Sequence, residues 1–169
     1  MPRGLKQTSS VVAIGFEAEE SAANTFAQAT VDLNLSPLDR EVFVVLAINL
    51  DPYTPDMVDA VDTLVASSLT TTSQTAVQEL SNSNCLAAAA NVIKNDGANA
   101  AAFTTGFFET PSGMGLEYVG IIATNDFFVQ VKGTGNTAAK AVTGKLYGFR
   151  ARADADIFSS LVQSEVLSA

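Results

Sequence analysis

Short apolar runs separated by turn signals constrain the fold of this chain more than any other feature. Residues 24–35 alternate polar and apolar side chains with a period of two, which is typical of a half-buried strand. Residues 41–51 form a continuous β-branched run between turn signals, which predicts a central strand buried on both faces. Further runs follow at intervals of roughly 8–12 residues. The pattern predicts a mainly β chain that folds as an antiparallel β-sandwich with one or two short helices.

Two segments carry helical patterns. Residues 56–66 place apolar side chains at helical spacing after Thr54, a candidate N-cap, and Pro55, a residue suited to the first helical turn. Residues 156–167 predict a second short helix at the end of the chain. Residues 85–94 are rich in alanine but lie between Asn-rich turns, so both helix and strand stay open there.

The rest of the chain indicates a single domain. Residues 1–10 are polar, and we expect a flexible N-terminal arm there, with no apolar stretch of the secretory type. Residues 11–169 contain no linker and no internal repeat, and we expect one β-sandwich domain over that range. Within it, residues 67–82 predict one or two short strands.

The absence of histidine excludes several kinds of chemistry. Without histidine, and with Cys85 as the single cysteine, the chain cannot form a Ser-His-Asp or Cys-His pair or the commonest zinc sites. The densest acidic cluster, Asp51, Asp56, Asp59 and Asp62, lacks the spacing of a calcium loop, and we interpret it as a solvated helix face. We therefore expect no catalysis, no metal and no cofactor.

The low share of charged residues indicates an unusual protein surface. Hydrophobic residues make up 47% of the chain and charged residues 16%, below the roughly 25% usual for soluble domains. Either neighbouring subunits cover part of the surface, or the surface is neutral and rich in Thr and Asn. The net charge of −9 argues against binding nucleic acid over the whole surface. With no group that titrates near neutral pH, we expect assembly to respond to ionic strength or acid pH.

Cations gather in one part of the sequence. Residues 127–153 contain five cations and no anion. Three interpretations remain open: pairing with the chain's own acids, contact with an acidic neighbouring subunit, or contact with nucleic acid or anionic lipid through Lys145, Arg150 and Arg152.

Two aromatic pairs suggest outward anchors. Phe107-Phe108 and Phe127-Phe128 place one ring on each side of a strand, so one ring of each pair is a candidate for an interface. The alternative is a sheet covered by the chain's own helix. The candidate interface residues are Arg3, Lys6, Phe108, Phe128, Lys145, Arg150 and Arg152.

The stretches REVFVVLAINLDP, LEYVGIIATNDFFVQVKGTGN and VTGKLYGFRARADADIFSSLVQSEVLS resemble the single jelly-roll coat proteins of tailless icosahedral viruses. The resemblance implies eight strands in two sheets, a capsid built from many copies, and termini that grip neighbours. It implies partners that are copies of the chain and other coat proteins, a place in the virion after synthesis in host cytoplasm, and no catalytic residues. A non-catalytic binding or adhesion module remains the alternative, and a small enzyme using carboxylates or lysine the third.

Overall fold

The computed structural model describes residues 3–106, 108–109 and 116–168, with the backbone alone at 108 and 109. Two antiparallel sheets contain all the strands of this part of the chain. Sheet A consists of β1 (Leu5–Gln7), β2 (Val12–Glu19), β4 (Glu41–Pro52), β8 (Phe108–Glu109), β9 (Gly120–Ile122) and β11 (Ala141–Ala153). Sheet B consists of β3 (Ala27–Asp32), β5 (Thr63–Thr70), β6 (Cys85–Asn95), β7 (Ala100–Thr105) and β10 (Asp126–Thr134).

The strand order is that of a jelly roll. In sheet A, β11 pairs with β2 and β4, and β4 pairs with β9. In sheet B the order is β3-β10-β5-β6-β7. Among β2–β6 and β9–β11, every connection except β5–β6 crosses from one sheet to the other, which gives the eight-stranded, two-sheet jelly roll. This confirms the predicted fold class; β7 and β8 are additions between β6 and β9.

The core lies between the sheets. Phe43, Ile48 and Leu146 from sheet A pack with Val129 and Phe127 from sheet B, and all five side chains are fully or almost fully buried. Burying a side chain of this size contributes about 1.5–3 kcal/mol. The apolar face expected over residues 24–35 is confirmed, because its members pack in this core, although the strand itself covers residues 27–32. Burial on both faces is confirmed for the first half of the strand predicted at residues 41–51, whereas Asn49 is half-buried and Asp51 is exposed in its second half.

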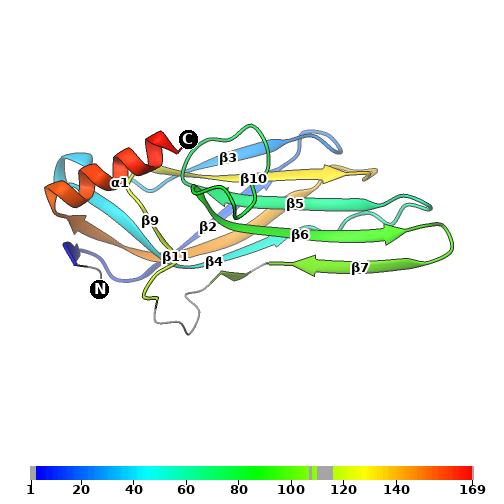
Figure 1. The fold of residues 1–169 in the computed structure, drawn as a ribbon. Helices are drawn as coiled ribbons and strands as arrows, with labels where there is room; N and C mark the ends of the chain where they lie inside the picture. The colour runs from blue at the N-terminus through cyan, green and yellow to red at the C-terminus, as the bar shows by residue number, and fades with distance from the viewer. Residues whose placement is uncertain (1–2, 107, 110–115, 169) are drawn as a thin grey trace.

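The α-helix α1 (Ala155–Leu167) covers that outer face at one end of sheet A (Figure 1). Its apolar side chains Phe158, Leu161 and Val162 pack on Val44 and Phe149 of the sheet. The sequence predicted this helix to within one residue. Within the described residues, no helix has the length and apolar character needed to cross a membrane.

The prediction of a helix at residues 56–66 is wrong. The chain makes a tight turn there, with Ala60 at a φ of 55° and a bridge between Val58 and Val61, and then enters β5. The Asp56 carboxylate, expected in a first helical turn, instead binds the β10–β11 connection. Long-range contacts therefore outweigh a local pattern that was apolar at helical spacing but rich in β-branched residues.

Two neighbouring segments were predicted in part. Residues 85–94, left open between helix and strand, are a strand, because β6 pairs along its length with β5. The strand expected within residues 67–82 ends at Thr70, and a loop follows to Asn84. Part of the predicted arm, Leu5–Gln7, pairs with the end of β11, while flexibility in the remainder of residues 1–10 stays a prediction.

Candidate self-association surface

The candidate self-association surface includes the hairpin of β6 and β7, which points to the end of the molecule opposite α1 (Figure 1). Its turn is closed by the side chain of Asp96, which accepts hydrogen bonds from the backbone N–H groups of Asn99 at 2.6 Å and Ala98 at 2.9 Å. These bonds hold the pKa of Asp96 below its ordinary value. Gly97 has a φ of 87°, a conformation that glycine adopts without strain. Local sequence therefore sets the hairpin, because Asn95, Asp96 and Gly97 are residue types that favour tight turns between strands.

All six residues of β7 are exposed, and none of them carries a charge. The strand pairs with β6 on one side, and in the described part of the chain no strand pairs with its other side. Phe103 is 56% exposed. An edge strand of this kind presents free backbone N–H and C=O groups to another chain.

The register aligns apolar side chains across the outer face of sheet B. Leu64 of β5 lies opposite Val92 of β6, which lies opposite Phe103 of β7. The next row contains Ala66, Ala90 and Thr105. The cation at the far end of β6, Lys94, pairs with Asp62 at 2.7 Å, and this contact holds the pKa of Asp62 below its ordinary value. The two apolar rows, Leu64-Val92-Phe103 and Ala66-Ala90-Thr105, together with the rest of β7, are called here the β5–β7 surface.

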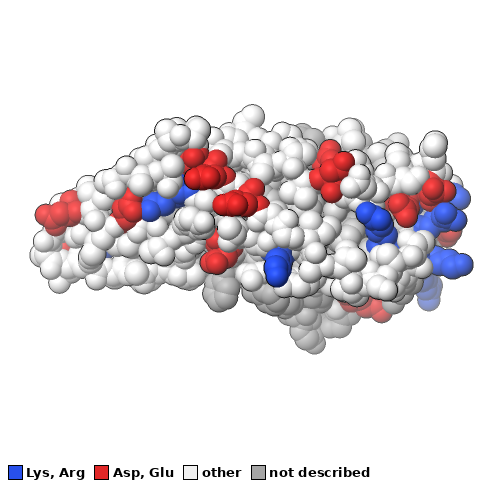
Figure 2. Space-filling model, turned by 180° about the vertical axis from the view of Figure 1, so that it is seen from behind, with Lys and Arg blue, Asp and Glu red and all other residues white. Residues whose placement is uncertain are grey.

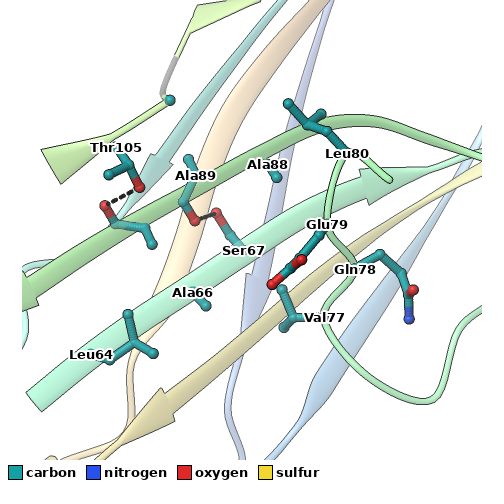
Figure 3. A pocket seen from close by; sticks show the side chains of 12 residues that line it. Leu64, Ala66, Ser67, Val77, Gln78, Glu79, Leu80, Ala88, Ala89 and Thr105 are labelled. Carbon is teal, nitrogen blue, oxygen red and sulfur yellow. Dashed lines mark hydrogen bonds between the residues drawn. The ribbon is translucent and has the colours of Figure 1, made fainter. Parts of the chain in front are cut away.

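An apolar groove of about 490 Å³ lies on this surface (Figure 3). Its floor is formed by small side chains, including Ala66, Ala88 and Ala90, and the loop after β5 contributes Val77 and Leu80. Of the residues that line it, Glu79 alone is charged. The groove ends at Thr105 and Gly106, so it adjoins the end of β7.

Hydrogen bonds hold the loop of residues 71–84 against the sheet. The backbone N–H of Gln78 donates to Ser68 Oγ at 3.0 Å, and that hydroxyl donates to Gln130 Oε1 at 2.7 Å. Gln130 is fully buried, and its amide group donates to Thr70 Oγ1 at 2.7 Å and to Gln28 Oε1 at 3.0 Å. Because a buried amide without partners is costly, this network specifies where the loop sits.

The residues predicted for an interface do not form one site. Lys6 and Arg152 are register partners in sheet A, and Arg3 precedes them at the same end of the molecule; all three are exposed. Lys145 is exposed farther along β11, opposite Asn49.

Two of the cations have partners in their own chain. The Arg150 guanidinium donates to the Leu33 carbonyl at 2.8 Å, and Arg152 pairs with Asp39 at 3.3 Å. The pairs of Arg152 with Asp39 and of Lys140 with Asp56 correspond to the first of the three interpretations of the basic stretch, pairing with the chain's own acids, whereas the partner of Arg150 is a backbone carbonyl. A role of Arg150 or Arg152 in assembly remains a prediction.

The aromatic pairs were predicted to split between core and surface. Phe127 is fully buried and makes an edge contact with Phe16, with ring centroids 5.7 Å apart. Phe128 faces outward and is half-buried. Phe108 lies in β8 opposite Asn49, but its side chain lies outside the described atoms, as does Phe107.

Sequence reasoning missed β7 as a site. The signal was present as a run of uncharged residues from Ala100 to Thr105, directly after a hairpin turn. Elsewhere the charges are sparse, and Figure 2 shows separate small groups of them on a largely uncharged face. Among the described residues, no three His, Cys, Asp or Glu side chains are placed to hold a metal ion.

Similarity to known proteins is found among solved structures. No family model matches the chain, and no curated protein matches it. Among solved structures, the unassembled pentamer of Merkel cell polyomavirus VP1 is similar, with 6% identity, a TM-score of 0.36, and coverage of 87% of this chain and 97% of that one. Desmodium yellow mottle tymovirus is similar with 15% identity, a TM-score of 0.30, and coverage of 92% and 95%. The jelly-roll architecture that the expected resemblance implied is confirmed by the order of the strands in the two sheets.

Proposed function

We propose that this chain is a structural coat protein that self-assembles into a capsid shell, and that it acts without catalysis. The observation that carries the proposal is the β5–β7 surface: a largely apolar face, with Glu79 as the charged residue of its groove, that ends at an uncharged strand edge. Contiguous apolar surface and an unprotected edge are disfavoured in a protein that stays a monomer. The jelly-roll order of the strands supports the same proposal as an architecture that builds shells in many viruses.

The negative net charge limits the surfaces through which two copies can associate. Two copies, each with a net charge of −9, repel one another unless they meet through neutral surface or through paired charges. The β5–β7 surface provides the neutral route. Lys145, Arg150 and Arg152 would provide the charged route, toward an acidic neighbour, nucleic acid or an internal membrane. In this proposal the partners are copies of the chain and other coat proteins, and the chain is placed in the virion after synthesis in host cytoplasm.

Ionic strength distinguishes the two routes. Association through neutral surface should strengthen as salt rises from about 0.01 M to 0.5 M, because salt screens the repulsion between acidic copies. Association through cations and an acidic neighbour should weaken over the same range. Lowering the pH toward the isoelectric point near 4.2 should also favour association through neutral surface.

The experiment is sedimentation velocity and negative-stain microscopy of the purified chain over a series of protein and salt concentrations. Oligomers, rings, sheets or shells that grow with salt support the proposal. A monomer at every protein and salt concentration would overturn it. In that case the groove of about 490 Å³ favours the alternative, a non-catalytic sandwich module that binds a partner on the outer face of sheet B.

A further inference from the structure

In the described part of the chain, each of the two sheets has two edges, and three of these four edges carry features that discourage pairing. The edge of β2 displays exposed Glu17 and Glu19, and the β8–β9 edge consists of strands of two and three residues. The edge strand β3 is largely half-buried and ends at Asp32. Charges and short strands are the devices by which proteins protect their edges.

The fourth edge, β7, has none of these devices. It is six residues long, contains no proline and no charge, and is exposed along its whole length. From this contrast we infer that β7 pairs with β7 of a second copy, as antiparallel neighbours related by a two-fold axis. The inference deepens the proposed function and rests on it.

Symmetry and charge both favour a second copy as the occupant. A strand that meets its own copy across a two-fold axis is necessarily antiparallel, the arrangement of every neighbouring strand in this sheet. With the axis between Phe103 and its own copy, Ala102 faces Thr104, Ala101 faces Thr105 and Ala100 faces Gly106, so each of the six residues faces a neutral residue of the other copy. The pairing joins two five-stranded sheets into one and brings no like charges of β7 opposite each other.

Side chains next to the edge add apolar contact. Phe103 is flanked on the outer face by Val92 of its own β6, and in the paired dimer it approaches its counterpart across the axis. The groove, which adjoins β7 at Thr105, continues this apolar surface on each copy. Because six residues bury less area than a stable interface, we expect a weak dimer, with a dissociation constant of roughly 1 μM to 1 mM. A shell would then require further contacts.

The test introduces one charge into the edge. Ala102→Lys changes the net charge from −9 to −8 at an exposed residue of β7. The matched control, Leu38→Lys, makes the same change of charge at a residue that is 96% exposed in the short helix of residues 37–39, away from any strand. The change in overall repulsion is therefore equal, so a difference between the variants reports on the β7 edge.

Sedimentation velocity of the full chain should show dimerisation at least about tenfold weaker for Ala102→Lys than for Leu38→Lys, with the control like the wild type. Hydrogen exchange of wild-type residues 100–105 should slow as protein concentration rises. If Ala102→Lys has an altered thermal melt, Thr104→Lys is the second edge variant, at another exposed residue of β7.

The outcomes separate the two proposals. A wild type that associates equally well with either lysine, or that gains exchange protection only outside residues 100–105, overturns β7 pairing and leaves the coat function standing. A wild type that stays monomeric overturns both.

Discussion

Glu165 offers a sharp test of how the C-terminal helix is held. Its side chain is buried beneath α1, and its carboxylate accepts hydrogen bonds from the backbone N–H groups of Ala123 and Thr124, both at 2.9 Å. Replacing Glu165 with alanine leaves the buried N–H of Ala123 unpaired, at about 1–3 kcal/mol. The N–H of Thr124 is half-buried and can reach water, so its loss costs about 0.5–1.5 kcal/mol.

The desolvation cost of the buried carboxylate opposes these losses of stability. Burial of the carboxylate raises the pKa of Glu165 despite its two backbone hydrogen bonds, so alanine also removes a desolvation cost. We therefore expect Glu165→Ala to lower the free energy of unfolding by about 2–3 kcal/mol, which corresponds to roughly 4–12 °C in Tm for a chain of this size.

Urea unfolding followed by far-ultraviolet circular dichroism measures this difference. Gln163→Ala is the matched control, because it makes a similar change of helix propensity at an exposed position of the same helix. The hydrogen bonds to Glu165 would be energetically unimportant if the two variants had the same stability within about 0.5 kcal/mol.

The same carboxylate predicts a dependence on pH. Because the folded state raises the pKa of Glu165, the folded protein binds its proton more tightly than the unfolded chain does. The contribution of Glu165 to stability should therefore be greatest below its ordinary pKa of 4.5 and decline as the pH rises from there through its folded value. The stability difference between wild type and Glu165→Ala should be larger at pH 4 than at pH 7, and an opposite trend would contradict the assignment.

Two further substitutions test contacts that stabilise the β-sandwich. Asp56→Asn should lower Tm, whereas the exposed control Asp59→Asn should not, because Lys140 is the chief contact that holds the pKa of Asp56 well below its ordinary value. This stabilisation should fade as the pH falls below about 3.8, and equal Tm values for the two variants at pH 7 would refute it. Gly148→Ala should destabilise by about 1–3 kcal/mol or more in urea unfolding, because a Cβ there meets a backbone carbonyl and an aromatic ring of β4, whereas Gly15→Ala, whose nearest atom lies at 4.0 Å, should be near neutral.

Local patterns predicted the elements that depend on local interactions. The strand at residues 41–51 and the C-terminal helix were both found close to their predicted bounds. In each, turn signals border a run whose period matches one secondary structure. Residues 56–66 failed because their helical spacing was outweighed by contacts of Asp56 with residues more than 80 positions away.

The candidate surface shows the same division. The sequence by itself determined that residues 100–105 are uncharged and adjacent to a hairpin turn, and that the chain as a whole is poor in charge. Only the tertiary structure decided that this run lies at the edge of a sheet with one side unpaired, while similar runs lie in the middle. The reason is physical: side-chain period sets which face of a strand is apolar, but the order of strands in a sheet depends on pairings between distant segments. The prediction of a coat protein thus acquired a specific edge, β7, through which copies can meet.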